Sequence, residues 1–298
     1  MQFHAERSSR QPGCLALAAR LLPDYGHRLL GYDEDPVPDF WIYFALCASA
    51  FLAGAVNAIA GGGTLLTFPA LLAITAPVMA NGTSTIALLP GSLASAGAYR
   101  KDIQHPPRLL RWLAAPSLIG GLIGTLLVTR TEERYFAALI PWLILGATIL
   151  LMLQPVIGRY VRGHAGGDAG EESVLPRKRL FALACAQLAV SIYGGYFGAG
   201  IGILMLSSLA FMGLRNLHEM NALKTLLAVG INGAAAVLFV LEKKVQWGYA
   251  APMAVAAIAG GYLGARFSLR FPPAAVRKVV LAIGFVLSGY YLYRQYGG

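Results

Sequence analysis

Long apolar runs separated by short polar segments make up most of this 298-residue chain. Most runs approach the roughly 20 residues that cross a bilayer as a helix, which predicts an all-α, polytopic membrane helix bundle. Two shorter runs directly follow glycine-rich segments, and we expect broken or partial helices there beside eight full spans. The predicted segments are 41–60, 64–76, 83–99, 112–129, 135–153, 180–198, 201–213, 222–240, 249–265 and 276–293.

The glycine-rich segments mark two related halves. The sequence NAIAGGGTLL, from Asn57 to Leu66, returns in altered form about 140 residues later as GYFGAGIGIL, from Gly195 to Leu204. Each half has five segments, an odd number, so the second copy enters the membrane in the opposite direction. Inverted repeats with matching broken helices are a recurrent design of secondary transporters. The predicted organisation is a tail at 1–40, a repeat at 41–153, a cytoplasmic linker at 154–179 and a repeat at 180–298.

Charge is scarce and confined to the segments between the apolar runs. Only 13% of the residues are charged, whereas a soluble domain carries about 25%. All 14 acidic residues lie outside the ten runs. Proton pumps and cation carriers commonly place a carboxylate inside the membrane, so this distribution favours an anionic substrate.

The net charge of +10 follows a membrane topology, and we expect no nucleic-acid partner. When the loops are placed alternately on two sides, one side holds 15 Lys or Arg and the other holds four. Excess Lys and Arg mark the cytoplasmic side, which predicts that both termini lie outside the cytoplasm. The basic loops are 99–111, 154–179, 213–224 and 265–278, and the opposite basic residues lie in 130–134 and 241–248.

The two broken helices are the candidate binding site. The first turn of a helix presents unpaired N–H groups and a partial positive charge, and glycine lets an anion approach the backbone. Nearby hydroxyl and amide groups add donors, although a hydroxyl equally bonds a carbonyl of its own helix and an asparagine equally caps a helix. The candidate donors are Asn57, Thr64, Asn81, Ser84, Thr85, Asn221 and Thr225.

Lys224 breaks the internal symmetry with a positive charge, because the first half has Ser84 at the matching position. Two interpretations stay open for it: the side chain extends to the cytoplasmic surface, or it attracts or counterbalances the anion. Tyr193 and Tyr196 lie beside the second glycine segment. We expect them to act as a gate.

Motifs for enzymatic chemistry are absent from the sequence. There is no phosphate loop of the Walker type, no zinc-binding helix motif and no acidic cluster for Mg²⁺. Cys14, Cys47 and Cys185 are too widely spaced to predict a disulfide framework or a metal site. We therefore expect a protein that is not an enzyme and needs no metal or cofactor.

The glycine motifs also resemble a known family. GGGTLL followed by FPALL within 57–72, NGTST at 81–85 and GAGIG at 198–202 look like the TauE/SafE sulfite exporter family of membrane permeases. The resemblance covers about residues 41 to 293. It implies an inverted-repeat bundle that moves sulfite or a related sulfur oxyanion outward across the bacterial inner membrane. By motif match, it assigns the anion site to Asn57, Gly61, Gly62, Gly63, Thr64, Gly198, Gly200 and Gly202.

We therefore expect an exporter of sulfite or a related oxyanion, working by alternating access at a midplane site between the two repeats. The alternatives are a permease for an organosulfonate or another small anion, and a membrane-embedded enzyme or sulfur-relay subunit. The expected partners are the small anion and the lipid bilayer, and a homo-oligomer stays open. The second copy has Gly195 opposite Asn57, so the two halves need not contribute equally.

The charge distribution yields a topology prediction. A reporter fused after Gly298 is expected to signal a location outside the cytoplasm, and one inserted within 163–170 is expected to signal the cytoplasm. The measurement is the activity of paired reporters that work in only one compartment each. Two fusions that report the same compartment would contradict this topology.

Overall fold

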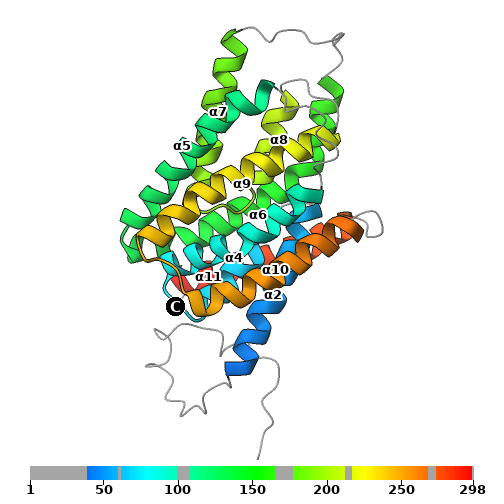
Figure 1. Cartoon of the computed structure of the whole chain (residues 1–298). Helices are drawn as coiled ribbons and strands as arrows, with labels where there is room; N and C mark the ends of the chain where they lie inside the picture. Colours follow the sequence, from blue (N-terminus) through cyan, green and yellow to red (C-terminus); the bar gives the residue numbers. More distant parts are fainter. Residues whose placement is uncertain are drawn as a thin grey trace, which may run out of the picture.

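The computed structural model describes residues 39–59, 62–98, 108–164, 177–211, 217–267 and 273–296, and within these ranges all regular structure is helical (Figure 1). The predicted all-α fold is therefore confirmed for the described residues, where every predicted apolar segment overlaps one helix. The helices are α2 (Asp39–Ile59), α3 (Thr64–Leu72), α4 (Pro77–Ala98), α5 (Arg108–Arg130), α6 (Glu133–His164), α7 (Arg177–Tyr196), α8 (Ile201–Phe211), α9 (Leu217–Leu241), α10 (Trp247–Phe267) and α11 (Pro273–Tyr296).

Four helices of the described residues are long and apolar enough to cross a membrane. They lie in α2, α5, α6 and α9, and the qualifying stretch of α6 is also the most apolar of the four. The chain is thus a multi-pass membrane protein. The qualifying stretches are Phe40–Ala58, Leu110–Arg130, Glu133–Leu153 and Leu223–Leu241.

The helices α3 and α8 are too short to cross a bilayer. They contain 9 and 11 residues, which at a rise of about 1.5 Å per residue gives roughly 14 and 17 Å. The hydrocarbon core of a bilayer is about 30 Å thick. Each of these helices therefore reaches only part of the way, as the short runs after the glycine segments predicted.

Two helices begin earlier than the apolar pattern predicted. α4 starts at Pro77 and α9 at Leu217, whereas the predicted starts were 83 and 222. Proline suits the first helical position because its missing N–H needs no partner there. The next N–H, of Val78, donates to Glu133 Oε2 at 3.1 Å. Asn81 and Asn221 consequently lie inside helices, so the interpretation of both as N-caps is wrong.

α6 is longer than predicted, because it continues from Glu133 to His164. The predicted segment ended at 153, so the predicted linker begins inside this helix. Pro141 and Pro155 both lie within it. The next described residue after His164 is Arg177, where α7 begins.

α5 shows how the helices divide their surfaces between lipid and protein. Its outward face is apolar, with Ile119 52% and Leu127 51% exposed. Its inward face is small and polar, with Ser117 and Thr125 buried. This inverts the pattern of a soluble helix, and it fits membrane packing, where small residues let helices approach and hydroxyls bond internally.

Each half has one helix that packs mainly on helices of the other half. α10, from the second half, packs mainly on α2 and α4, whereas α5, from the first half, packs mainly on α7 and α9 (Figure 1). Glycines permit the close approach of the backbones at both contacts. A side chain on Gly124 would overlap the carbonyl of Ile192, and one on Gly260 would overlap the carbonyl of Phe51.

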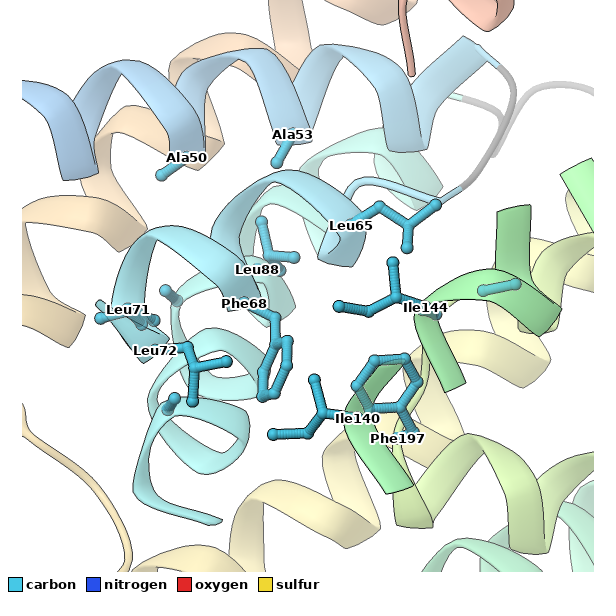
Figure 2. Packing of buried hydrophobic residues seen from close by; sticks show 14 of the residues in the cluster. Ala50, Ala53, Leu65, Phe68, Leu71, Leu72, Leu88, Ile140, Ile144 and Phe197 are labelled. Atoms are coloured by element: carbon cyan, nitrogen blue, oxygen red, sulfur yellow. The ribbon is translucent and has the colours of Figure 1, made fainter. Parts of the chain in front are cut away.

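A buried aromatic and aliphatic cluster joins the halves around α3. Phe68 of α3 is fully buried, and its ring centroid lies 5.1 Å from that of Phe197 and 6.4 Å from that of Phe136. Figure 2 shows Phe68 beside Ile140 and Phe197, with Leu65 facing α6. Phe197 directly follows α7. The two glycine segments are thus linked through packed side chains rather than through a shared strand or disulfide.

The close contact of α5 with α7 can be tested at Gly124. Gly124→Val would force the added carbons onto the backbone of Ile192 and Tyr196, and overpacking of this kind costs about 1–3 kcal/mol or more. We expect a lower unfolding temperature in detergent. The matched control is Gly146→Val, because a side chain at Gly146 meets nothing within 4 Å. Equal unfolding temperatures for both variants would contradict the described packing.

Candidate functional site

The first glycine segment ends α2 and turns the chain into α3. Gly62 has a φ of 93°, a left-handed conformation that residues with a side chain rarely adopt. Gly63 packs so closely on α2 that a side chain there would overlap the carbonyl of Ala53. Gly61, also predicted for the site, lies outside the described residues. The sequence therefore requires glycine here for two separate reasons, conformation at one position and space at the next.

Asn57 closes the first break. Its Oδ1 accepts a hydrogen bond from the N–H of Gly63 at 2.8 Å. The following N–H groups, of Leu65 and Leu66, donate to the carbonyls of Gly62 and Gly63 at 3.0 and 2.9 Å. Much of the donor capacity at this helix start is therefore used within the protein.

Two side chains donate hydrogen bonds to the second break, one from the end of α7 and one from α5. Gly198 and Gly200 have φ values of 80° and 78°, so this break contains two left-handed residues. The hydroxyl of Tyr193 donates to the carbonyl of Ala199 at 2.8 Å. The hydroxyl of Thr125, from α5, lies 2.8 Å from the carbonyl of Gly121 in its own helix and 3.1 Å from the carbonyl of Gly195, and it shares its one proton between them. Both hydroxyls therefore bond carbonyls of the break and leave its N–H groups without these partners.

The start of α8 retains free donors. The N–H groups of Ile203 and Leu204 both bond the carbonyl of Gly200. Within the described part of the chain, the N–H groups of Gly200, Ile201 and Gly202 meet no acceptor. These are the groups that carry the partial positive charge of a helix N-terminus.

Lys224 lies at this helix start and is buried. Only 6% of it is exposed, and a side chain on Gly202 would lie 3.3 Å from Lys224 Cδ and 3.8 Å from Cε. No described residue forms a hydrogen bond or ion pair with it. Leu223, Leu227 and Ile201, its neighbours in sequence or across the helix pair, belong to an apolar cluster. The lysine therefore packs inward and does not extend to the cytoplasmic surface.

Asn81 reaches the second break from α4, in the other half. It is 1% exposed, and its Nδ2 donates to the carbonyl of Tyr196 at 2.9 Å. That carbonyl is at the C-terminal end of α7, where helices leave carbonyls unpaired. The Oδ1 atom of Asn81 is buried without a partner among the described residues. Asn81 thus caps a helix of the opposite half and keeps one acceptor unused.

The hydroxyl candidates divide into two kinds. Ser84 and Thr67 share a hydrogen bond of 2.6 Å between α4 and α3, whereas the hydroxyl of Thr85 donates to the carbonyl of Asn81 in its own helix at 2.9 Å. Thr64 and Thr225 are both partly buried, in the first turn of α3 and beside Lys224. Ser84 and Lys224 therefore correspond in place as well as in sequence, because each side chain faces the short helix of its own half.

The predicted residues thus form two groups, and only one of them holds a charge. Asn57, Gly62, Gly63, Thr64 and Ser84 lie at the first break, while Asn221 lies in α9 with its side chain outside the described set. The second-break group consists of Asn81, Tyr193, Tyr196, Gly198, Gly200, Gly202 and Lys224. Thr85 and Thr225 lie in α4 and α9.

The sequence did not identify the residues that join the two breaks. Phe68, Phe136 and Phe197 pack between them, and Tyr196 lies 5.6 Å from Phe136 between ring centroids. Thr67, the partner of Ser84, was also missed, although it lies one turn after Thr64 in the same short helix. Among the described residues, no three His, Cys, Asp or Glu side chains gather as a metal site.

Comparison with known proteins identifies the family. The model of the family described as sulfite exporter TauE/SafE matches residues 46–291. The chain belongs to the TauE/SafE family. The match includes both glycine segments, α3 and α8 of this TauE/SafE member, together with Asn57, Asn81 and Lys224.

Bacterial relatives of this TauE/SafE member carry transporter names. A probable membrane transporter protein from Haemophilus influenzae is 28% identical over 247 residues, covering 82% of this chain and 92% of the relative. The probable membrane transporter protein YfcA from Escherichia coli K12 is 29% identical over 256 residues, covering 83% and 88%. YunE from Bacillus subtilis, with the same description, is 24% identical over 267 residues, covering 83% and 96%. No solved structure matches the chain significantly.

The resemblance seen in the glycine motifs is therefore confirmed, and the protein is a member of a membrane transporter family. The relatives' names state no substrate.

The role of Asn57 gives a stability prediction. Asn57→Ala removes the acceptor for the Gly63 N–H and leaves a buried donor unpaired, at a cost of about 1–3 kcal/mol. We expect a lower unfolding temperature in detergent, and recovery of most of it in Asn57→Asp, which keeps an acceptor. Ser49→Ala is the control, because Ser49 bonds only the Leu46 carbonyl of its own helix. If Asn57→Ala lowers the unfolding temperature as little as Ser49→Ala does, the bond from Gly63 to Asn57 does not stabilise the break.

Proposed function

We propose that this TauE/SafE member exports a small sulfur oxyanion, most simply sulfite, across the bacterial inner membrane, and that the anion binds at the second break. The observation that carries the proposal is Lys224, buried at the start of α8 and unpaired among the described residues. A buried charge without a partner is costly. An anion placed there would be its counter-ion.

Two positive features meet at this place. The free N–H groups of Gly200, Ile201 and Gly202 present the positive end of α8, and Lys224 packs across the same turn. These features repel each other in the absence of a negative charge. Backbone N–H groups and a lysine are also the donors that bind oxyanions such as phosphate in proteins. An oxyanion would satisfy both at once.

The first break supports a different role. At the first break, the N–H of Gly63 already donates to Asn57. The residue that corresponds to Lys224 there is the neutral Ser84, which shares a hydrogen bond with Thr67. We propose that the first break orders the bundle, and that each chain holds one charged anion site. In this proposal the two halves contribute unequally, in keeping with the Gly195 that stands opposite Asn57 in the second copy.

The helix contacts support two inverted repeats, and they suggest which parts move. The pairs α2–α10 and α5–α7 correspond when the halves are exchanged, as do α4–α10 and α5–α9. We propose two moving units, each a half that has exchanged one helix: α2, α3, α4 and α10 in the first, and α7, α8, α9 and α5 in the second. α4 and α9 contact each other between these units.

Alternating access would then rock one unit against the other. The hydrogen bond from Asn81 to Tyr196 crosses between the units, so it would break or re-form during the cycle. Tyr193 braces the break through its bond to Ala199, and Tyr196 packs on Phe136. We propose that these two tyrosines act as the gate on the Asn81 side of the site.

The substrate is tested by flux in vesicles. Purified protein in proteoliposomes is expected to move labelled sulfite, with sulfate, thiosulfate and methanesulfonate added separately as competitors. Competition by thiosulfate or methanesulfonate stronger than self-competition by sulfite would assign a different sulfur anion. If labelled sulfite does not move, and none of the other three anions is bound or transported either, the proposal is wrong.

Lys224→Met separates a binding role from a structural one. Methionine keeps an unbranched stem beside Gly202 and removes the charge. We expect sulfite flux to fall by about tenfold or more, as for loss of a hydrogen bond to a charged group. We also expect the unfolding temperature to rise, since replacing an unpaired buried charge with an apolar group relieves a cost.

The matched control is Lys278→Met, at an exposed lysine of α11, which should change neither quantity. A lysine with only a structural role predicts the opposite pattern for Lys224→Met, a lower unfolding temperature with flux reduced only in step with the amount of folded protein.

A further inference from the structure

We infer that the second break selects the singly charged, hydroxyl-bearing form of an oxyanion, through the buried Oδ1 atom of Asn81. The inference rests on the proposed function and concerns which protonation state of the anion is carried. Asn81 Oδ1 is a hydrogen-bond acceptor, whereas Lys224 and the free N–H groups of α8 are donors.

The orientation of the Asn81 amide is fixed by its partner. A carbonyl oxygen can only accept, so the carbonyl of Tyr196 requires the NH₂ group of Asn81 to face it. The opposite orientation would place two oxygens against each other. Oδ1 is therefore held beside the end of α7, buried and without a donor among the described residues. An acceptor in this state requires a donor to be satisfied.

The position of this acceptor distinguishes it from the other unpaired groups. Four side-chain nitrogen or oxygen atoms of the described residues are completely covered and have no hydrogen-bond partner; Lys224 Nζ is not among these fully covered atoms. Of the residues that carry the four, only Asn81 bonds a residue of a glycine break. Tyr196 precedes Gly200 by four residues, so the acceptor and the free donors of α8 border one short connection. The four atoms are Asn81 Oδ1, Gln187 Oε1, Ser208 Oγ and Arg277 Nε.

The charges and hydrogen bonds together specify the ligand. Lys224 supplies one positive charge, and no carboxylate of the described residues offsets it. One negative charge on the ligand therefore balances the site. Its unprotonated oxygens accept from Lys224 and from the N–H groups of Ile201 and Gly202, while a hydroxyl on the ligand donates to Asn81 Oδ1. A dianion overbalances the charge and leaves Asn81 unpaired, and a sulfonate matches the charge but has no donor.

Selenite and methanesulfonate are the probes for this inference. The singly charged form of selenite holds its proton on oxygen, and its doubly charged form has none. Methanesulfonate stays singly charged throughout the same pH range and has no hydroxyl, so it reports any effect of pH on the protein itself. Initial rates of uptake into proteoliposomes are measured at a fixed total concentration across the pH range in which selenite loses its last proton, with rates in protein-free vesicles subtracted.

The selenite rate, divided by the methanesulfonate rate, is expected to rise as pH falls, in proportion to the singly charged selenite. At the acidic end, we expect selenite to move about tenfold faster than methanesulfonate, which corresponds to one satisfied hydrogen bond. Asn81→Leu removes the acceptor and should bring this ratio close to one. Gln187→Leu is the matched control, because Gln187 Oε1 is likewise buried and unpaired, while its Nε2 donates to the hydroxyls of Ser117 and Ser191 and not to a glycine break. It should keep the wild-type ratio.

The outcomes separate this inference from the proposed function. A rate ratio that is independent of pH, or that follows the doubly charged form, overturns the inference while anion transport stands. If sulfite, selenite and methanesulfonate all fail to move, the proposed function fails and takes the inference with it. If sulfite moves and selenite does not, only the inference is overturned. Should Asn81→Leu fail to fold, the pH profile of the wild-type protein decides alone.

Discussion

Peptide groups that are freed where one helix stops and the next starts must find partners inside the protein, because lipid offers none. This constraint governs both glycine breaks. At the first, Asn57 accepts the N–H of Gly63, and of the first three N–H groups only those of Gly62 and Thr64 lack an acceptor among the described residues. At the second, Thr125, Tyr193 and Asn81 satisfy carbonyls, and the donors at the start of α8 stay free. The two breaks share a sequence motif, yet they differ in which polar groups remain available.

The parts of the fold that depend on local sequence could be predicted. Apolar runs gave the helices, and Gly62, Gly198 and Gly200 marked the turns because left-handed backbone is a property of single residues. Hydropathy does not mark the start of α4. Pro77 is a local signal for the first helical position, whereas the acceptor of the Val78 N–H is Glu133, 55 residues away, a contact that no local pattern reveals.

The candidate site was predicted in composition but not in arrangement. Lys224 was identified from its position opposite Ser84, but its direction depends on the absence of a side chain at Gly202, a contact between helices that spacing along the chain cannot reveal. Of the two roles left open for Asn81, the N-cap of its own helix is wrong, and the binding role stays a prediction. Asn81 caps the end of α7 through Tyr196, 115 residues later, rather than the start of its own helix.

The exchange of α5 and α10 has a consequence for the assembly of the fold. Neither sequential half buries its own small-residue helix faces, since α10 covers α2 and α5 covers α7. A polypeptide ending before Arg177 would present α5 with its glycine face bare, and it could hide that face only in another copy. The close packing of these faces therefore forms only once residues from both halves of the chain have come together.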